Sequence, residues 1–304
     1  MKNPFFSIVI PTFNQAKLLK VALDSIYLQS FKNYEIIIID NYSNDKTSYV
    51  LKNFKKKIKI KKIKNKGIIA KSRNLGIKLS RGKWICFLDS DDYWLPQKLK
   101  SIFKLINTKK CDVVCHSEKI LDNSQKNKKV WLYGPYTKNF YATLLKKGNR
   151  LSTSASTVNR KFINKNNIIF DENKKFVTAE DYSFFLNIAN CGGKFYFENK
   201  PLGFHLLHSK SASSNEDKHF KATENVIKHH IFKIQSFEKD KNKLWKIVYN
   251  NFLFRKVLLT NKYDSFFTKL KKLFFSSLKF SQNEFEYLIL IFYKKIRSIY
   301  FNLI

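Results

Sequence analysis

The sequence predicts an α/β fold with a mostly parallel central sheet, followed by a C-terminal helical extension. Along the first two-thirds of the chain, short apolar runs typical of buried parallel strands alternate with helix-like segments. Beyond residue 215 this alternation gives way to long lysine-rich stretches that also contain many phenylalanines, tyrosines and leucines. We therefore expect a first region at residues 1–215, with helices on both faces of the sheet, and a basic helical region at residues 216–304.

The opening strand and helix have the clearest patterns. Residues 7–11 form an apolar run that ends in Pro11, as expected for a strand buried on both faces. In residues 16–30, apolar side chains recur every three or four positions, which predicts a helix lying on the sheet with Asn14 as its N-cap. Further strands are predicted at residues 34–40, 58–63, 84–88 and 113–116, and further helices at residues 46–54, 70–79 and 96–106.

The pattern weakens in the middle of the chain. Pro96 is predicted just inside the helix at 96–106, where its missing N–H is tolerated. Over residues 122–173 only a helix at 140–146 is indicated, and then a helix at 179–189 and a strand at 194–198 follow. Because ligands bind at the carboxyl ends of parallel strands, the polar clusters after Ile10, Ile39 and Leu88 are expected to share one site.

The charge of the chain is strongly positive. Its 304 residues include 58 Lys and Arg against 23 Asp and Glu, a formal charge of +35. This charge favours anionic partners such as nucleic acid, phospholipid headgroups or a phosphorylated glycan. A/T-rich coding explains the same abundance of lysine, asparagine, isoleucine and phenylalanine without any partner, so the charge alone decides neither fold nor chemistry.

Four unevenly spaced cysteines, Cys86, Cys111, Cys115 and Cys191, indicate reduced thiols rather than a disulfide framework. A zinc site at Cys111 and Cys115 would lack a second Cys/His pair. The first strand begins too early for a signal peptide, and the apolar runs fall short of the roughly 20 residues that span a bilayer. We therefore expect a cytoplasmic protein that is not integral to a membrane.

Three carboxylates, Asp89, Asp91 and Asp92, follow the predicted strand at residues 84–88. Carboxylates crowd together only with a compensating cation, and hard oxygen ligands suit Mg²⁺ or Mn²⁺. Such a cation would hold the phosphates of a substrate. The alternative is that Asp91 and Asp92 only cap the next helix, since acidic residues favour helix starts.

Four ordered segments add specificity to this interpretation. They are SIVIPTFN at residues 7–14, IDNYSND at 39–45, NKG and SRNLG within 65–76, and the stretch 82–92 with its acidic loop. In order and spacing they resemble family 2 glycosyltransferases, which are inverting enzymes of the GT-A fold. The resemblance implies a catalytic domain at residues 1–215, with a nucleotide-binding half at 1–110 and an acceptor half at 111–215.

The resemblance also implies a nucleotide site at the ends of the first two strands. Pro11, Thr12 and Phe13 would border the nucleoside, and Asp40 would accept a hydrogen bond from the base or the ribose. Many family members have a second acid after the residue matching Asp40, where this chain has Asn41. Uracil remains the expected base.

In the acidic loop, the resemblance implies that Asp89 and Ser90 contact the donor, that Asp91 is the principal metal ligand and that Asp92 braces the loop. Arg73 is expected to face the nucleotide, because a planar cation suits phosphate or a base edge. The alternative for Arg73 is a solvated helix arginine.

A second acidic pair, Glu180 and Asp181, opens the predicted helix at residues 179–189. Family members have such a pair near the acceptor, and inverting transfer needs a base that takes the proton of the attacking hydroxyl. The resemblance implies Asp181 as this base and Glu180 as the residue that holds the acceptor or orients Asp181. The alternative is simple complementarity with the helix dipole.

The segment at residues 205–213 resembles the family's histidine and serines that close over the diphosphate. His208 matches that histidine and is the second candidate metal ligand, with a structural histidine as the alternative. Leu206 stands where many relatives have arginine, which weakens the expected diphosphate contact. Lys210 would add positive charge.

The predicted function is inverting, Mn²⁺- or Mg²⁺-dependent transfer of a sugar from a nucleotide diphosphate donor, expected to be a UDP-sugar. The acceptor is expected to be a hydroxyl in a cell-surface polysaccharide or a lipid-linked oligosaccharide. Aromatics interleaved with lysines at residues 252–257 and 274–280 suit a peripheral helix on the anionic inner face of a membrane. They equally suit helices packed on the catalytic domain.

Two other functions fit the sequence less well. The charge suggests a nucleic-acid-binding protein, but the lysines are spread along the whole chain and no known binding module is recognisable, so no nucleic acid partner is expected. A sugar-phosphate nucleotidyltransferase would carry a glycine-rich loop after the first strand, and residues 11–14 contain no glycine.

Overall fold

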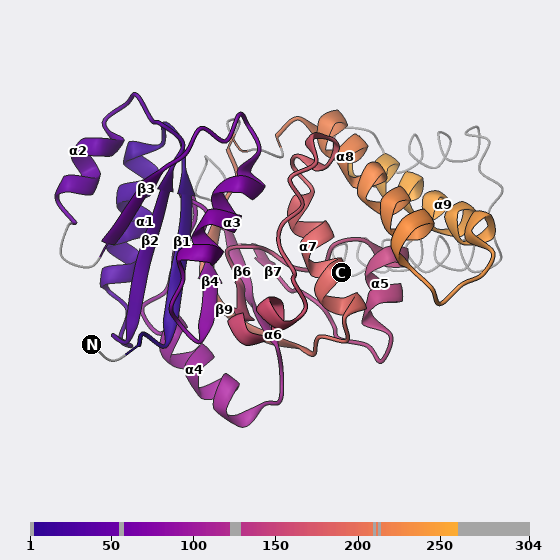
Figure 1. Ribbon diagram of the computed structural model, residues 1–304, viewed down its shortest axis with the longest axis horizontal. Coiled ribbons are helices and arrows are strands. Elements are labelled where there is room, and N and C mark those ends of the chain that lie inside the picture. The colour runs from indigo at the N-terminus through magenta and orange to yellow at the C-terminus, as the bar shows by residue number, and fades with distance from the viewer. Residues whose placement is uncertain (1–2, 55–57, 122–128, 209–210, 212–213, 261–304) are drawn as a thin grey trace, which may run out of the picture. The chain divides into compact units, whose positions relative to one another are not determined.

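A computed structural model describes residues 3–54, 58–121, 129–208, 211 and 214–260 (Figure 1). The chain forms two compact units, residues 1–235 and 236–304. Helix α8 (Glu216–His229) belongs to the first unit, because its apolar side chains Ala222, Val226 and Ile227 are buried and it contacts α7 (Glu180–Asn190). The functional division at residues 215 and 216 stays a prediction, while the compact units divide 20 residues later, at Gln235 and Ser236.

A nine-stranded sheet forms the centre of the first unit, with the order β3-β2-β1-β4-β8-β6-β9-β5 and with β7 paired to β6. Strands β3, β2, β1 and β4 are all parallel, as predicted. Beyond β4 the sheet is mixed, because β8 lies antiparallel between β4 and β6. The strands are β1 (Phe6–Thr12), β2 (Tyr34–Asp40), β3 (Ile58–Lys62), β4 (Trp84–Phe87), β5 (Tyr93–Trp94), β6 (Val113–Leu121), β7 (Lys129–Trp131), β8 (Ser156–Asn159) and β9 (Phe195–Leu206).

Helices cover both faces of the parallel half of the sheet, as predicted. On one face, side chains of α1, α2 and α4, among them Leu23, Leu51 and Ile102, pack into one cluster with Ile8 and Ile36 of the sheet. On the other face lie α3 and α7. The other helices of the first unit are α1 (Ala16–Tyr27), α2 (Thr47–Lys52), α3 (Ile69–Leu79), α4 (Lys98–Thr108), α5 (Phe140–Lys147) and α6 (Arg160–Lys165), with a 3₁₀ helix at Lys174–Phe176 and a π-helix at His230–Ile234.

On the face of the sheet covered by α3 and α7, the helices pack closely against the strands. A Cβ built on Gly76 of α3 would lie 2.2 Å from Cγ1 of Val9 in β1, so α3 approaches the sheet more closely than a helix with a larger residue at this position could. The ring of Phe87 in β4 meets the rings of Phe170 and Phe184 edge-on at 5.2 and 5.9 Å. These contacts fix the start of α7 relative to the end of β4.

The structure corrects two predicted helix starts. Asn14 is not the N-cap of α1: Gln15 holds that position without a side-chain bond, and Oδ2 of Asp45 accepts the hydrogen bond of the Ala16 N–H at 2.9 Å. Asn14 is instead in the left-handed region (φ 50°). Pro96 lies outside α4, which begins at Lys98.

The second unit contains α9 (Lys241–Thr260), in agreement with the predicted C-terminal helices. The stretch at residues 274–280 lies outside the described residues. Among the helices that the structure describes, none has both the length and the hydropathy that crossing a bilayer requires.

Candidate active site

Strands β1 and β2 bring Thr12 and Asp40 side by side at their carboxyl ends, where their Cα atoms are register partners. Asp40 is fully buried, and its Oδ1 accepts hydrogen bonds from N–H and Oγ of Ser43 at 2.9 and 2.6 Å. Its Oδ2 and the Oγ1 of Thr12 have no hydrogen-bond partner among the described residues, and Lys62 Nζ stays 3.9 Å from Oδ2. Buried polar atoms left without a partner are costly, so this pair suits hydrogen bonds with a ligand.

The other predicted nucleoside residues flank this pair. Pro11 is buried within β1, whereas the side chain of Phe13, just beyond the strand, is about half exposed. Asn41 has a structural contact, because its Oδ1 accepts the hydrogen bond of the Asn65 N–H at 2.9 Å. Asn41 therefore ties the loop after β2 to the turn before α3.

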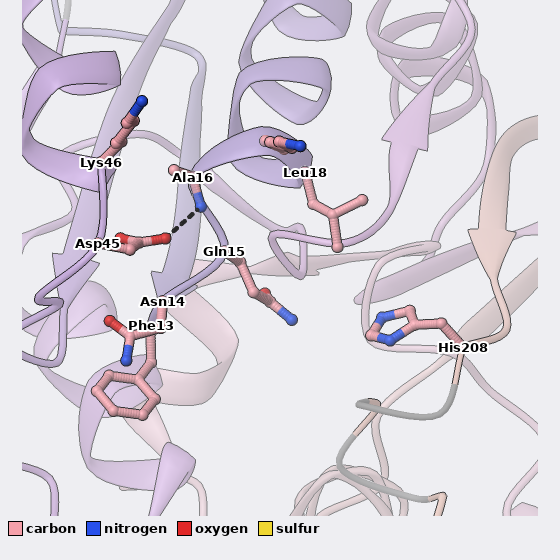
Figure 2. Close-up of a pocket in the computed structure, with 9 residues that line it drawn as sticks. Phe13, Asn14, Gln15, Ala16, Leu18, Asp45, Lys46 and His208 are labelled. Carbon is pink, nitrogen blue, oxygen red and sulfur yellow. Dashed lines mark hydrogen bonds between the residues drawn. The ribbon is translucent and has the colours of Figure 1, made fainter.

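A pocket of about 600 Å³ opens between the start of α1 and His208 (Figure 2). In Figure 2 the side chains of Gln15 and His208 face the space between the first-strand loop and the segment after β9. Its lining residues come from the loop after β1, the first turn of α1, the loop after β2 and the segment after β9: Phe13, Asn14, Gln15, Ala16, Lys17, Leu18, Asp45, Lys46 and His208.

The two predicted metal ligands meet. Oδ2 of Asp91 and Nε2 of His208 are 2.9 Å apart, and both side chains are mostly buried. Burial, together with the negative charges of Asp92 and Asp89, raises the pKa of Asp91 to about 6. The carboxylates of this loop therefore lie where a positive charge would stabilise them.

The spacing of these two atoms also suits a divalent cation. With 2.9 Å between Oδ2 of Asp91 and Nε2 of His208, both atoms could contact one cation. The described residues contain no group of three or more His, Cys, Asp or Glu side chains that could hold a metal. Asp91 and His208 thus fit an ion that takes its other ligands from phosphate and water, as Mg²⁺ commonly does.

Asp92 ties the acidic loop to β9. Its carboxylate lies 3.2 Å from Nδ1 of His205 and accepts the hydrogen bond of the Leu206 N–H at 3.1 Å. Although burial opposes the charged imidazole, Asp92, with the charges of Glu118 and Asp91, raises the pKa of His205 to about 10. Asp92 therefore has the bracing contacts that the sequence predicts.

Arg73 joins the acidic loop to α7. Its side chain is 4 % exposed, and its two terminal nitrogens donate to Glu180 Oε1 at 2.6 Å and to Asp89 Oδ1 at 2.7 Å. The guanidinium also lies over the ring of Phe170, with its carbon 5.3 Å from the ring centroid. Arg73 is therefore not a solvated helix residue, and both of its terminal nitrogens have carboxylate partners. Its contact with a nucleotide stays a prediction.

Ser90 and the backbone of Asp89 are held by residues that the sequence did not indicate. The hydroxyl of Ser90 donates to Oε1 of Gln15 at the start of α1, and the Asp89 N–H donates to Oγ of Ser154 at 3.0 Å. Neither Gln15 nor Ser154 lies in the four segments that carry the resemblance. Only the fold, which places the α1 start and the segment before β8 against the acidic loop, reveals them.

Asp181 begins α7 beside Glu180, but the two carboxylates differ in surroundings. Glu180 is buried and has both oxygens engaged, by Arg73 and by the Thr178 N–H. Asp181 is partly exposed, and its Oδ2 accepts a hydrogen bond from Asn149 Nδ2 at 3.0 Å. Although the residue is partly exposed, desolvation of its carboxyl group and the charge of Glu180 raise the pKa of Asp181 to about 7. A carboxylate with such a pKa suits general-base chemistry near neutral pH.

Some predicted features are separate from this site or beyond the described residues. All four cysteines are free thiols, and burial raises the pKa of Cys111 and of Cys115 to about 11 and about 12. Such thiols resist the deprotonation that zinc binding requires. Lys210 lies outside the described residues.

The amino-acid sequence matches a known protein family and curated relatives. The family model described as "Glycosyl transferase family 2" matches residues 7–166, more than half of the chain. A relative in Escherichia coli is the UDP-Glc:alpha-D-GlcNAc-diphosphoundecaprenol beta-1,3-glucosyltransferase WfaP, 31% identical over 225 residues, which are 73% of this chain and 85% of that protein. Another is the poly(ribitol-phosphate) beta-N-acetylglucosaminyltransferase TarP of Staphylococcus aureus (strain N315), 34% identical over 113 residues, 36% of this chain and 35% of that protein.

Solved structures share the fold at low sequence identity. S. aureus TarS 1–349 in complex with UDP-GlcNAc aligns with a TM-score of 0.65 and 20% identity over 81% of this chain and 72% of that chain. The mannosyltransferase PcManGT of Pyrobaculum calidifontis, in complex with GDP-Man and Mn²⁺, aligns with a TM-score of 0.54 and 13% identity over 95% of this chain and 84% of that chain. The expected GT-A fold is confirmed by these likenesses. With the sheet, the acidic loop and the family match all in agreement, the chain is a glycosyltransferase and belongs to glycosyltransferase family 2.

Proposed function

We propose that this enzyme transfers a sugar from a UDP-sugar to a hydroxyl of a cell-surface polysaccharide or a lipid-linked oligosaccharide, with inversion at the anomeric carbon. The observation that carries the proposal is the contact between Asp91 and His208. Oδ2 of Asp91, in a loop with two further carboxylates, lies 2.9 Å from Nε2 of His208. The name of WfaP states a UDP-Glc donor and a diphosphoundecaprenol-linked GlcNAc acceptor, and the name of TarP states a poly(ribitol-phosphate) acceptor. These names support a UDP-sugar donor and a lipid-linked or polymeric acceptor.

In this proposal the nucleoside binds at the ends of β1 and β2. Thr12 and Asp40 have unpartnered buried oxygens there, and the half-exposed ring of Phe13 lies beside them as a contact surface for the base. Asp40 Oδ2 accepts a hydrogen bond from the base or the ribose, which would satisfy an otherwise costly buried acceptor.

Asp91 and His208 hold a divalent cation, Mn²⁺ or Mg²⁺. When bound, such a cation stabilises the charge that builds on a departing diphosphate. Asp89 faces the donor while Arg73 holds it in place, and Ser90 is held by Gln15.

Asp181 acts as the base. It removes the proton of the acceptor hydroxyl as the hydroxyl oxygen forms its bond to the anomeric carbon and the bond to the nucleoside diphosphate breaks. Glu180 has both oxygens engaged and so serves to position Arg73 and the start of α7. Asn149, which donates to Oδ2 of Asp181, keeps the carboxylate oriented.

Peripheral contact with an anionic inner membrane face through residues 216–304 belongs to the same proposal. It would bring the enzyme to a lipid-linked acceptor. The support is compositional, since lysines and aromatic residues alternate along this region.

A thermal-shift panel tests the donor and metal sites. UDP with Mn²⁺ should raise the melting temperature by several degrees, since a ligand at about 100 times its Kd stabilises the native state by about 2.7 kcal/mol. Asp91→Asn should remove the metal-dependent part of this shift. Asp24→Asn, which removes an exposed carboxylate of α1, is the matched control and should keep the shift. A flat panel for the wild type would contradict the proposed function.

A second experiment tests whether Asp181 is the base. Asp181→Asn should keep the UDP and Mn²⁺ shift but lose transfer by a factor of about 10² or more. Sugar transfer is measured with radiolabelled UDP-sugar and extracted lipid or polysaccharide acceptors. Transfer at the wild-type rate in this variant would remove Asp181 from the reaction.

A further inference from the structure

Trp131 is a large aromatic side chain left partly uncovered beside the site. It ends β7 and is 41 % exposed in the part of the chain that the structure describes. Trp131 is the register partner of Glu118 in β6, whose neighbour β9 continues into the segment that carries His208. A tryptophan exposed this far in an ordered strand is typical of a binding surface, because the ring offers a large contact area with little conformational entropy to lose.

Trp131 is connected to the acidic loop through one histidine. The centroids of the Trp131 and His205 rings are 5.6 Å apart, and their planes differ by 30°. His205 in turn lies 3.2 Å from the carboxylate of Asp92, next to the proposed metal ligand Asp91. The indole is therefore supported on one side by a ring that is itself fixed to the acidic loop.

Trp131 is also connected to the proposed base through the chain that follows it. Two residues on, Tyr133 donates to Oε2 of Glu118 at 2.7 Å, which holds this segment against β6. Gly134 then pairs with Arg150 through two hydrogen bonds, Gly134 N–H to the Arg150 carbonyl at 3.1 Å and Arg150 Nη1 to the Gly134 carbonyl at 2.7 Å. Asn149, the residue before Arg150, donates to Asp181. Trp131 and Asp181 are thus linked by one run of chain and hydrogen bonds.

We propose that Trp131 is a stacking platform for a pyranose ring of the acceptor, and that it holds this sugar beside Asp181. The C–H face of a pyranose is apolar and flat enough to pack on an indole, whereas an open-chain polyol presents no such face. The inference rests on the proposed function and narrows its acceptor to glycans that present a cyclic sugar at the transfer site.

The contacts favour a sugar over a membrane as the occupant of this ring. Trp131 is held against His205 and is directed to the acidic loop through it. The neighbouring apolar side chains, Val130 and Leu132, are at least as exposed, at 44 % and 66 %, and neither has a contact with the acidic loop among those that the structure describes. A lipid contact would depend on all three side chains, but a stacked sugar depends on Trp131 alone.

The test measures glycoside binding to the full-length protein in the presence of UDP and Mg²⁺. The probes are methyl β-D-glucopyranoside and the methyl α-glycoside of N-acetylglucosamine, with ribitol as the open-chain control, observed by saturation-transfer NMR. The wild type should bind both glycosides through their ring C–H protons and should bind ribitol more weakly. Trp131→Ala should weaken glycoside binding about fivefold or more, and Trp131→Phe should restore part of it. Leu132→Ala, the matched control, should bind as the wild type does.

Five outcomes separate the possibilities. Equal glycoside binding by wild type and Trp131→Ala would overturn the platform, as would a wild type that binds UDP but neither glycoside. Equal losses in Leu132→Ala and Trp131→Ala would indicate a general apolar surface instead. Loss of sedimentation with phosphatidylglycerol vesicles in Trp131→Ala, with glycoside binding intact, would assign the ring to a membrane. A wild type that fails to bind UDP with metal would overturn the proposed function itself.

Discussion

Arg73 has two carboxylate partners from different elements, and both ion pairs are largely shielded from water. Removing the arginine leaves Asp89 and Glu180 without their counter-charge. We expect Arg73→Met to lower the free energy of unfolding by about 3–5 kcal/mol, the usual cost of breaking a buried ion pair. Urea unfolding followed by circular dichroism measures the change.

A surface arginine provides the control for this prediction. Arg81 pairs with Glu35 at 3.1 Å, but its side chain is 63 % exposed. Arg81→Met should cost less than about 1 kcal/mol. If Arg73→Met and Arg81→Met lowered the free energy of unfolding equally, burial would not explain the contribution of Arg73 to stability.

The raised pKa of Asp181 predicts a pH dependence of both rate and stability. As a base, Asp181 must be ionised, so kcat/KM should rise with pH and level off above about 7. For stability the sign is opposite. A folded-state pKa above the unfolded value means that the contribution of Asp181 is full below pH 4 and is lost as pH rises through about 7. The melting temperature of Asp181→Asn, measured relative to that of the wild type, should therefore increase between pH 5 and pH 8.

Rate profiles and thermal melts at these pH values test both parts. A rate that falls across pH 6–8, or a variant whose relative stability falls with pH, would contradict the assignment of the shifted pKa to Asp181.

At the residue scale, short motifs predicted the parts of the site that directly follow a strand of the sheet, even where 117 residues separate them. The acidic loop and His208 meet as expected, because each follows a strand that ends at the same edge of the sheet. The ion pair between Arg73 and Glu180 was not predictable in this way. Glu180 is 107 residues away, and only the packing of α7 on β4 brings the two together. Asn149 lies in a loop whose sequence has no signal for a contact with Asp181.

At the scale of elements, the contact between α3 and β1 leaves no room for a side chain at Gly76. Alanine normally stabilises a helix by about 1 kcal/mol over glycine. Here its Cβ would lie 2.2 Å from Cγ1 of Val9, a stiff and fully buried side chain. We expect Gly76→Ala to destabilise the protein by about 1–3 kcal/mol because of overpacking.

A double-mutant cycle checks the cause. Val9→Ala removes the two methyl groups nearest to the new Cβ, so the double variant should be more stable than the sum of the two single changes predicts. Strict additivity would show that the cost of Gly76→Ala arises elsewhere.

Buried elements were predicted from sequence far better than exposed or short ones. β1, β2 and β4 are apolar on both faces, and α1 has an apolar stripe, so their patterns follow directly from burial. Strand β8, with the sequence STVN, has a single aliphatic side chain and is held mainly by its position between β4 and β6. Strands β5 and β7 are two and three residues long, too short for any periodicity to appear.

At the scale of the whole molecule, the formal charge of +35 should be felt most by large anionic surfaces. We expect the full-length protein to sediment with phosphatidylglycerol vesicles at low salt and to be released at about 0.5 M NaCl, because screening weakens such binding. A chain ending at Gln235 should lose most of this binding. It should keep the UDP and Mn²⁺ shift, since every candidate site residue lies in the first unit.

Vesicle sedimentation and thermal shift on the same two proteins check this prediction. Sedimentation of the shortened chain at the full-length level would place the lipid contact in the first unit. Neutral phosphatidylcholine vesicles are the control and should bind neither protein.

The shared guanidinium of Arg73 also has a kinetic consequence. In the proposed reaction one of its partners, Asp89, contacts the donor, and the other, Glu180, precedes the proposed base Asp181. A substrate that binds one of these carboxylates changes the electrostatic field at the other. Binding of the donor should therefore change the affinity for the acceptor, and binding of the acceptor should change the affinity for the donor by the same factor. In initial-rate measurements with both substrates varied, the apparent KM for each substrate should then change with the concentration of the other.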